Sequence, residues 1–323
     1  MKLSFVIVTY NVRKYIGRCL ESVKTAIDDV RSLVGDAEVI VVDRGSDDGT
    51  TVAACDGFPG VTIIDAPGAG YATAANLGAA KAKGEIIVFL APEVEVQPGG
   101  IARIVEQFDT NPACAIAGGA VLSPKGDVLR GASRLPGFIS KLVTAAGLDR
   151  CVPCLAGDRY LELTTEVEAV SFSYAAVKAS AFCKLGRLDE RFFADFADTD
   201  LCRRARRSLV PAWSVVYIPS ARVRAQDNMC FRPEADAADL HGKGVVRARV
   251  RSEMLYVWKN FCILTVLANT ALEVAVQGVR YAWNIIPLLG TQKQAAHAAT
   301  VLCETGQAML DTQLGTQNPT TPW

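Results

Sequence analysis

Short apolar runs alternate with longer stretches of helical spacing along the first hundred residues. Apolar positions three and four residues apart predict a helix over 12–34, and a Gly- and Ala-rich segment leads into a second helix by residue 83. The apolar runs that predict strands are 3–9, 38–43, 61–65 and 85–90. Their lack of alternation is typical of parallel strands covered on both faces. The pattern therefore predicts an α/β fold, a Rossmann-like, doubly wound and mostly parallel sheet, with ligands at the carboxyl ends of its strands.

The pattern is less regular in the second half of the chain. We expect a helix over 99–109, an irregular region over 123–166, and further strands at 115–121, 168–177 and 215–218. Residues 219–251 look loop-rich and basic, and the following residues are apolar with helical spacing. The predicted organisation is a domain over 1–225, a basic connector over 226–251, an apolar or amphipathic helical extension over 252–314 and a flexible tail over 315–323.

Charge is balanced overall but not along the chain. The 323 residues hold 34 Lys and Arg, 34 Asp and Glu and 50% apolar residues, which excludes a disordered chain and a general nucleic-acid binder. Residues 201–251 carry eleven Lys and Arg against four Asp and Glu, so the remainder is acidic. No stretch of 18 residues lacks a charged side chain, and the first residues do not have the pattern of a signal peptide. We therefore expect a cytoplasmic protein with reduced cysteines.

Four segments, in this order and spacing, carry a resemblance to a known family. They are SFVIVTYN at 4–11, VVDRGSDDGT at 41–50, GYATAANLG at 70–78 with AKGE at 82–85, and LDERFF at 188–193 with DTDLC at 198–202. The chain resembles the family 2 glycosyltransferases of the GT-A fold over about residues 3–225, and most closely their rhamnosyltransferase-like branch. The resemblance implies an inverting enzyme that moves a sugar from a dTDP- or UDP-sugar to a saccharide or lipid-linked acceptor in cell-surface polysaccharide synthesis.

The same resemblance assigns the nucleotide-binding residues. It places Thr9 and Asn11 around the base of the donor and Asp43 in contact with the base. A carboxylate at a strand end can accept from a pyrimidine N–H or a ribose hydroxyl, and we favour this role over the alternative, in which Asp43 closes a turn with Ser46. Asn76 either approaches the sugar or phosphate, or belongs to a Gly- and Ala-rich helix start chosen for tight packing.

A divalent cation and a base complete the implied site. The resemblance places Glu93 at the last acidic position of a motif that follows the fourth strand, with Glu95 on the same side of an extended chain. These carboxylates would hold Mg²⁺ or Mn²⁺ on the diphosphate, or else form a solvated acidic turn. Asp198 is the candidate base for the acceptor hydroxyl, and the alternative is that it caps a helix starting near residue 201. Asp195 and Asp200 are nearby carboxylates.

Three polar positions expected from the resemblance hold alanine instead. They are Ala91 before the cation motif, Ala197 before the base, and Ala225 where relatives often carry a His. Phe172 also stands where relatives usually have a small Gly and could narrow the acceptor or sugar pocket. A second hypothesis is therefore a catalytically degraded homologue that acts as a nucleotide-sugar-binding or assembly subunit. The pair Cys151 and Cys154 lacks the further ligands that zinc requires.

The C-terminal part raises the question of a membrane. The Arg residues of 203–251 form either a solvated basic face or a surface that attracts phosphate or anionic lipid. Over 254–289 the polar residues recur at three- and four-residue steps as a narrow stripe on an otherwise apolar helix. Such a helix is either buried in the protein or lies in a membrane interface. We expect peripheral contact with the inner face of the cell membrane, and no nucleic-acid partner.

Overall fold

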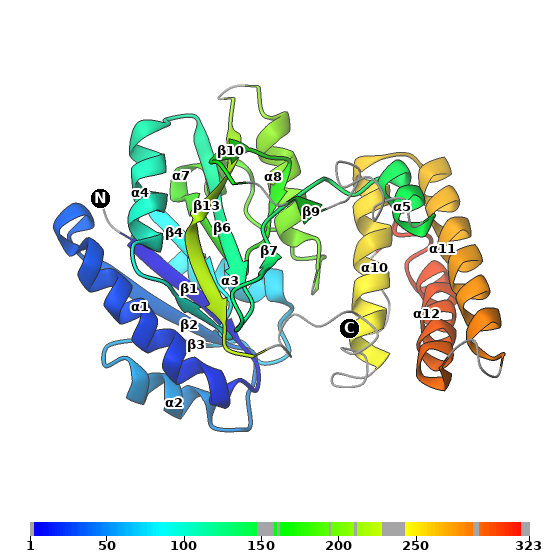
Figure 1. Cartoon of the computed structure of the whole chain (residues 1–323), viewed down its shortest axis with the longest axis horizontal. Helices are drawn as coiled ribbons and strands as arrows, with labels where there is room; N and C mark the ends of the chain where they lie inside the picture. The colour runs from blue at the N-terminus through cyan, green and yellow to red at the C-terminus, as the bar shows by residue number, and fades with distance from the viewer. Residues whose placement is uncertain are drawn as a thin grey trace. The chain divides into compact units, whose positions relative to one another are not determined.

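The chain divides into two compact units in a computed structural model (Figure 1). The structure describes residues 3–146, 158–159, 162–193, 195–209, 212–227, 243–286 and 291–317. The first unit comprises Met1–Leu135, Asp158–Glu190 and Ala197–Phe231, and the second comprises Pro136–Gly157, Arg191–Phe196 and Arg232–Trp323. The second unit thus takes in a segment from the middle of the stretch 1–225 that the sequence assigns to one domain. Each unit is described by itself.

The first unit is built on a mixed sheet that has ten strands among the described residues, in the order β10-β13-β6-β12-β4-β1-β2-β3 with β5 and β7 at its side. Strands β3, β2, β1 and β4 are parallel, and β12 lies antiparallel between β4 and β6. The strands are β1 (Leu3–Thr9), β2 (Ala37–Asp43), β3 (Thr62–Asp65), β4 (Ile86–Leu90), β5 (Val94–Val96), β6 (Cys114–Leu122), β7 (Val128–Arg130), β10 (Thr165–Glu166), β12 (Tyr174–Lys178) and β13 (Ser214–Ala225). A small second sheet contains β8 (Ala132–Ser133), β9 (Asp158–Arg159) and β11 (Ala169–Val170).

Helices cover both faces of the main sheet, as the uninterrupted apolar strands predict. The helices of this unit are α1 (Arg13–Val34), α2 (Thr50–Gly57), α3 (Tyr71–Lys81), α4 (Gly100–Thr110), α7 (Ala179–Lys184) and α8 (Ala197–Arg207). On one face, Phe5 and Ile7 of β1 share a buried core with Ile16 of α1 and Ile104 of α4. On the other face, Val6 of β1 packs against α3. The predicted α/β fold with a helical C-terminal extension is confirmed.

The structure corrects the sequence interpretation in the second half of the chain. Beyond β4 the sheet is mixed rather than mostly parallel, because β12 and β10 run against their neighbours. The predicted strand at 168–177 is two short strands in different sheets, β11 and β12. The last strand, β13, extends to Ala225 and so includes residues predicted to be loop. Alternating burial along its second half explains the miss, because Arg222 and Arg224 are polar positions of a strand with one solvated face.

Gly78 fixes how closely α3 approaches the sheet. A Cβ atom at this position would lie 2.6 Å from Cγ1 of Val6 and 3.0 Å from Cγ2 of Val42. We expect Gly78→Ala to lower the free energy of unfolding by about 1–3 kcal/mol, because the helix or the valines must move. Gly17→Ala is the matched control, since a Cβ there meets nothing within 4 Å. Urea denaturation measures both variants, and equal midpoints would contradict this account of the packing.

The second unit is helical in its described part. Its helices are α5 (Phe138–Ala145), α10 (Lys243–Asn260), α11 (Ile263–Asn284) and α12 (Gln292–Asp311), and α12 packs against both α10 and α11. The sequence predicts a loop-rich connector up to residue 251, but α10 begins at Lys243. Among the residues that the structure describes, no helix has the combination of length and hydrophobicity that crossing a bilayer requires.

Candidate active site

The carboxyl ends of β1 and β2 lie side by side, because Thr9 pairs with Asp43 in the parallel register. The Thr9 hydroxyl donates to Oδ1 of Asp43 at 2.8 Å, and the Ser46 hydroxyl donates to the same oxygen at 2.6 Å. Oδ2 of Asp43 accepts from the backbone N–H groups of Gly45 and Ser46, at 3.1 and 2.7 Å. Asp43 is buried. The turn with Ser46 that the sequence allows is therefore present, and the direct contact of Asp43 with a base stays a prediction.

Asn11 connects the two strand-end loops. Its backbone N–H donates to the Ser46 hydroxyl at 2.8 Å, and its side-chain oxygen accepts from the N–H of Asp47 at 3.0 Å. Asn11 is exposed and has a φ of 52°, a left-handed conformation that Asn tolerates better than most residues. Thr9, Asn11 and Asp43 thus form one hydrogen-bonded floor with the 44–47 loop. Their assignment to the nucleotide stays a prediction, and the geometry shows how they shape the loop that would receive it.

Asn76 lies inside the fold rather than on an open surface. Its Nδ2 donates to the carbonyl of Leu188 at 2.9 Å and to Oε1 of Glu190 at 3.0 Å. Its Oδ1 accepts from the N–H of Leu188 at 3.1 Å, and the residue is 5% exposed. Together with the close approach at Gly78, these bonds favour the packing alternative for this segment. Asn76 pins the 188–190 loop to α3, and its assignment as a nucleotide ligand does not fit this geometry.

Glu93 stands after β4, where the sequence places a cation ligand, and a second carboxylate lies near it. Burial raises the pKa of Glu93, its own backbone N–H lowers it, and the negative charge of Asp227 raises it. Asp227 accepts from the Tyr15 hydroxyl at 2.6 Å and pairs with Lys14 at 3.2 Å. The Glu93 carbonyl accepts from the N–H of Gln226 at 2.9 Å, which holds the end of β13 beside this loop.

Glu95 lies in β5, opposite Arg224 of β13. Glu93 and Glu95 both act on the buried Cys19, since their charges add to the effect of burial in raising its pKa. Glu93 and Glu95 are half-buried whereas Val94 and Val96 are buried, an alternation that agrees with the expected extended chain in which the two acids share a side. The oxygen donors of Glu93 and Asp227 fit a hard divalent cation, which takes one or two protein carboxylates and completes its shell with phosphate oxygens and water. Within the described ranges, no group of three or more His, Cys, Asp or Glu side chains could hold a metal ion.

Asp198 lies in the first turn of α8 and is half-buried. Its Oδ1 accepts from the N–H of Thr199 at 2.7 Å, and its Oδ2 accepts from the N–H of Phe172 at 3.2 Å. A capping side chain would accept from an N–H two or three residues further on, which these bonds are not. Burial raises the pKa of the Tyr71 phenol, and the charge of Asp198 raises it further. The role of Asp198 as the base stays a prediction.

Asp200 and Phe172, two further residues that the sequence singles out near the site, make structural contacts. Asp200 is fully buried and pairs with Arg204 at 2.8 Å, one helical turn away. Arg204 also donates to the carbonyls of Leu185 and Arg187. Phe172 is buried and stacked on Phe89, with ring centroids 5.0 Å apart, so its ring belongs to the core rather than narrowing a pocket.

The basic cluster is not one surface. Besides Arg204, Arg247 pairs with Glu304 at 2.7 Å, and the buried Arg251 pairs with Asp311, both within the helical unit. Arg247 and Arg251 therefore join helices. Arg206, Arg207, Arg222 and Arg224 are exposed, as the alternative of a solvated basic face expects. Cys151, Cys154 and His241 lie outside the described residues.

A short turn at 171–173 joins the halves of the candidate site. The N–H of Ala91, at the end of β4, donates to the carbonyl of Ser173 at 3.0 Å. The adjacent N–H of Phe172 donates to Asp198, as described above. The loop that carries Glu93 and the helix that carries Asp198 are thus tied through the 171–173 turn at the carboxyl end of β4, next to β1 in the sheet. The structure brings these two carboxylates to the same edge as Thr9 and Asp43.

Sequence reasoning missed two residues of this edge. Asp227 lies two positions beyond Ala225, and Tyr71 begins α3. The signal for Asp227 was the end of β13: had the strand been extended to Ala225, the next residues would have fallen beside β5. For Tyr71, an aromatic residue directly after Gly70 gave no sign that the charge of Asp198 would act on it.

The sheet order, with helices on both faces of the sheet, gives an α/β domain of the GT-A fold. The fold is shared with the mannosyltransferase PcManGT from Pyrobaculum calidifontis, solved in complex with GDP-Man and Mn²⁺, at a TM-score of 0.55 and 18% identity over 96% of this chain and 86% of that one.

Sequence comparison shows which known proteins the chain is similar to. Residues 4–160 match the model of glycosyl transferase family 2. The chain is 28% identical over 239 residues, 68% of its own length and 75% of the relative's, to the N-acetylglucosaminyl-diphospho-decaprenol L-rhamnosyltransferase of Mycobacterium tuberculosis. A shorter match of 149 residues, also 28% identical, covers 45% of this chain and 15% of the hyaluronan synthase of Pasteurella multocida. Residues 4–160, just under half of the chain, thus resemble glycosyl transferase family 2, and the 28% identical relative is a rhamnosyltransferase.

Proposed function

We propose that the protein is an inverting glycosyltransferase that moves a sugar from a nucleoside-diphosphate donor, a dTDP- or UDP-sugar, to a lipid-linked saccharide. The observation that carries this proposal is the meeting of Glu93, Asp198 and the Thr9–Asp43 floor at one edge of the sheet. The relative's name, which specifies a diphospho-decaprenol-linked acceptor and a rhamnosyl transfer, supports the acceptor class. The acceptor would place the enzyme at the inner face of the membrane, in cell-surface polysaccharide synthesis.

The reaction is a single displacement. The acceptor hydroxyl oxygen forms a bond to the anomeric carbon while the bond from that carbon to the diphosphate oxygen breaks. Asp198 takes the hydroxyl proton, and the nucleoside diphosphate leaves with the bonding electron pair. Phe172 and Thr199 donate backbone N–H groups to the Asp198 carboxylate and so orient it. The 44–47 loop, held by Asp43 and Asn11, would receive the nucleotide.

Glu93 and Asp227 would hold the divalent cation, Mg²⁺ or Mn²⁺. When bound, such a cation offsets the charge that develops on the diphosphate leaving group. The burial that raises the pKa of Glu93 makes the carboxylate costly to keep charged alone, and a cation compensates that cost. Glu95 lies opposite Arg224 in the sheet, and Asp227 pairs with Lys14, so Glu93 is the principal candidate of the three.

Glu93→Gln is expected to weaken Mn²⁺ binding by about tenfold or more, in the presence of a nucleoside diphosphate. The amide removes the negative charge but keeps the shape of the side chain. Electron paramagnetic resonance of free Mn²⁺ measures the affinity without requiring turnover. Glu95→Gln serves as the matched control and is expected to change the affinity less than threefold. Equal losses in the two variants would contradict the assignment of Glu93.

Three alanines at positions where polar residues are expected support a second candidate function. Ala91, Ala197 and Ala225 replace polar residues expected from the resemblance, and Ala197 and Ala225 are buried. This favours, as the alternative, a homologue that binds a nucleotide sugar as an assembly subunit without turnover.

A donor panel separates the two functions. The full-length protein is incubated with dTDP- and UDP-sugars, Mn²⁺ and a polyprenyl-diphosphate-linked saccharide, and release of nucleoside diphosphate is measured. Release that requires the acceptor supports the transferase. Donor binding by calorimetry without release supports the subunit. Absence of donor binding across the panel would overturn both.

A further inference from the structure

Helix α11 is amphipathic, but its apolar side chains are exposed and its polar side chains are buried, the reverse of a helix that faces water. Its outer side chains are apolar: Leu264 is 71% exposed, Val279 is 68% exposed and Trp283 is 56% exposed. The exposed large apolar side chains from 263 to 286 are Ile263, Leu264, Leu267, Val274, Val279, Tyr281, Trp283, Ile285 and Ile286. At 100° per residue they spread over about half the circumference of the helix. The solvent-facing side of α11 is therefore a broad apolar surface, here called the outer face.

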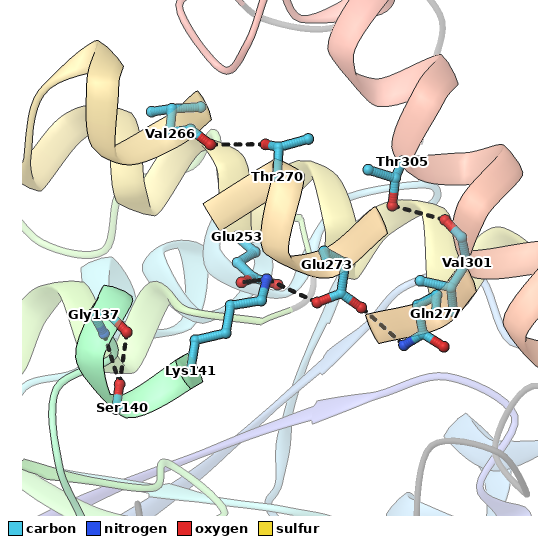
Figure 2. Close-up of polar contacts among 10 residues, drawn as sticks. All are labelled: Gly137, Ser140, Lys141, Glu253, Val266, Thr270, Glu273, Gln277, Val301 and Thr305. Carbon is cyan, nitrogen blue, oxygen red and sulfur yellow. Dashed lines mark hydrogen bonds and ion pairs between the residues drawn. The ribbon is translucent and has the colours of Figure 1, made fainter. Parts of the chain in front are cut away.

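The inner side of α11 carries its polar residues (Figure 2). Asn269, Thr270 and Gln277 are buried. Glu273 pairs with Lys141 of α5 at 2.8 Å and accepts from Gln277 at 2.9 Å, and the same Lys141 contacts Glu253 of α10 at 2.5 Å. The polar stripe predicted from the sequence is thus directed into the helical unit, where carboxylates and a cation satisfy one another. This arrangement costs hydrophobic burial on the outer face.

Charge and aromatic residues indicate what covers the outer face. Between 261 and 286 the charged residues are Glu273 and Arg280 alone. Glu273 is held inward by Lys141, so the exposed part of this stretch carries one positive charge and no negative one. Tyr281 and Trp283 adjoin Arg280, and all three are exposed. Aromatic and cationic side chains beside an apolar helical face are typical of the headgroup region of a bilayer, where anionic lipids attract Arg.

We propose that the outer face of α11 lies in the boundary between headgroups and acyl chains of an anionic phospholipid bilayer. The inference deepens the proposed function, on which it rests for the lipid carrier of the acceptor. A second copy of the chain is a less fitting occupant, because paired helices bury a narrow seam of two positions per seven residues, whereas the outer face is wider. Docking by this face would hold the enzyme where a polyprenyl-linked substrate resides.

Vesicle sedimentation of the full-length protein tests the proposal. We expect binding to vesicles of phosphatidylglycerol and phosphatidylethanolamine at 0.1 M salt, and at least fivefold weaker binding to phosphatidylcholine. The double variant L264E/V274E is expected to bind the anionic vesicles at least tenfold more weakly. Leu310→Glu is the matched control, since Leu310 is 81% exposed on α12 rather than α11, and it should bind like the wild type.

Fluorescence gives a second measurement that reports on the helix directly. Anionic vesicles should shift the tryptophan emission of the wild type to shorter wavelength, and Trp283→Phe should remove most of that shift. Absence of vesicle binding, or equal binding by L264E/V274E and the wild type, would overturn the proposal. So would a dimer in light scattering that L264E/V274E converts to a monomer without any vesicle binding. Turnover on a soluble acceptor is measured separately, so vesicle binding without turnover would refute the transferase and leave the outer face assigned.

Discussion

Replacing Asp198 with asparagine is expected to reduce turnover by about 10²–10⁴-fold while donor binding stays near the wild-type level. Asparagine keeps an oxygen that can accept from Thr199 or Phe172, but it cannot take the proton of the acceptor hydroxyl. The loss should therefore fall on kcat rather than on donor affinity. Release of nucleoside diphosphate and calorimetry with the donor measure the two quantities on the same preparation.

Asp65→Asn is a suitable control for this experiment. Asp65 also ends a parallel strand, in register with Asp43, but its side chain is exposed and belongs to no part of the proposed site. Its variant should turn over like the wild type. An Asp198→Asn protein that keeps more than a tenth of the wild-type rate would show that the base lies elsewhere. Tyr71, whose pKa the charge of Asp198 raises, would then be the next residue to examine.

Lys141→Met is expected to lower the free energy of unfolding by about 3 kcal/mol at pH 8, because Glu253 and Glu273 would face one another without their cation. Their side chains are only 27% and 22% exposed. Urea denaturation followed through Trp258 and Trp283 measures the loss. The triple variant K141M/E253Q/E273Q should recover most of it, since removing both charges removes the repulsion. A triple variant as unstable as Lys141→Met would contradict the ionic account.

The pH dependence of this cluster has a definite sign. Burial would lower the pKa of Lys141, but Glu253 and Glu273 outweigh it and the pKa lies above its ordinary value. The contribution of Lys141 to the free energy of unfolding is therefore complete below about pH 10 and is lost as the pH rises through its folded pKa. Burial would raise the pKa of Glu273, but Lys141 lowers it below its ordinary value. That contribution is present above about pH 4 and is lost as the pH falls through the folded pKa.

In Lys141→Met the dependence of the free energy of unfolding on pH should change sign on the acid side. Without the cation, burial and mutual repulsion raise the carboxylate pKa values in the folded state, so protonation now stabilises the fold. The difference between variant and wild type should therefore shrink between pH 8 and pH 4. A difference that stays constant over this range would mean that Lys141 acts through packing of its methylene chain alone.

The parallel part of the fold could be predicted from the sequence because its signal is local. The apolar run predicted at 3–9 is β1 itself, and the helix predicted over 12–34 is α1 within one residue. The mixed part could not be predicted, since β12 inserts between β4 and β6, from distant parts of the chain, and no local pattern specifies that pairing. The strand predicted at 215–218 ended too early, because buried and exposed residues alternate along the second half of β13, as in a strand with one solvated face.

The candidate site was predictable in its residue types but not in its bonds. Positions after strands indicated Asp43 and Glu93, since parallel strands end at one edge. The sequence could not decide between ligand and structural roles, because that depends on partners far along the chain. Asn76 is the clearest example. Its hydrogen-bond partner Leu188 is 112 residues away, and this bond indicates a structural role for a residue expected to bind the nucleotide.

The chain passes between its two units five times, and this affects how the protein is made. Lys141 leaves the ribosome 112 residues before its partner Glu253. At a synthesis rate of about 5–20 residues per second, roughly 5–20 s pass between the synthesis of Lys141 and that of the carboxylates that neutralise it. During synthesis an unpaired lysine and an uncovered helix are thus carried by a growing α/β domain. Cutting the chain after residue 231 would make that interval permanent, so the helical unit cannot be removed as a simple appendage.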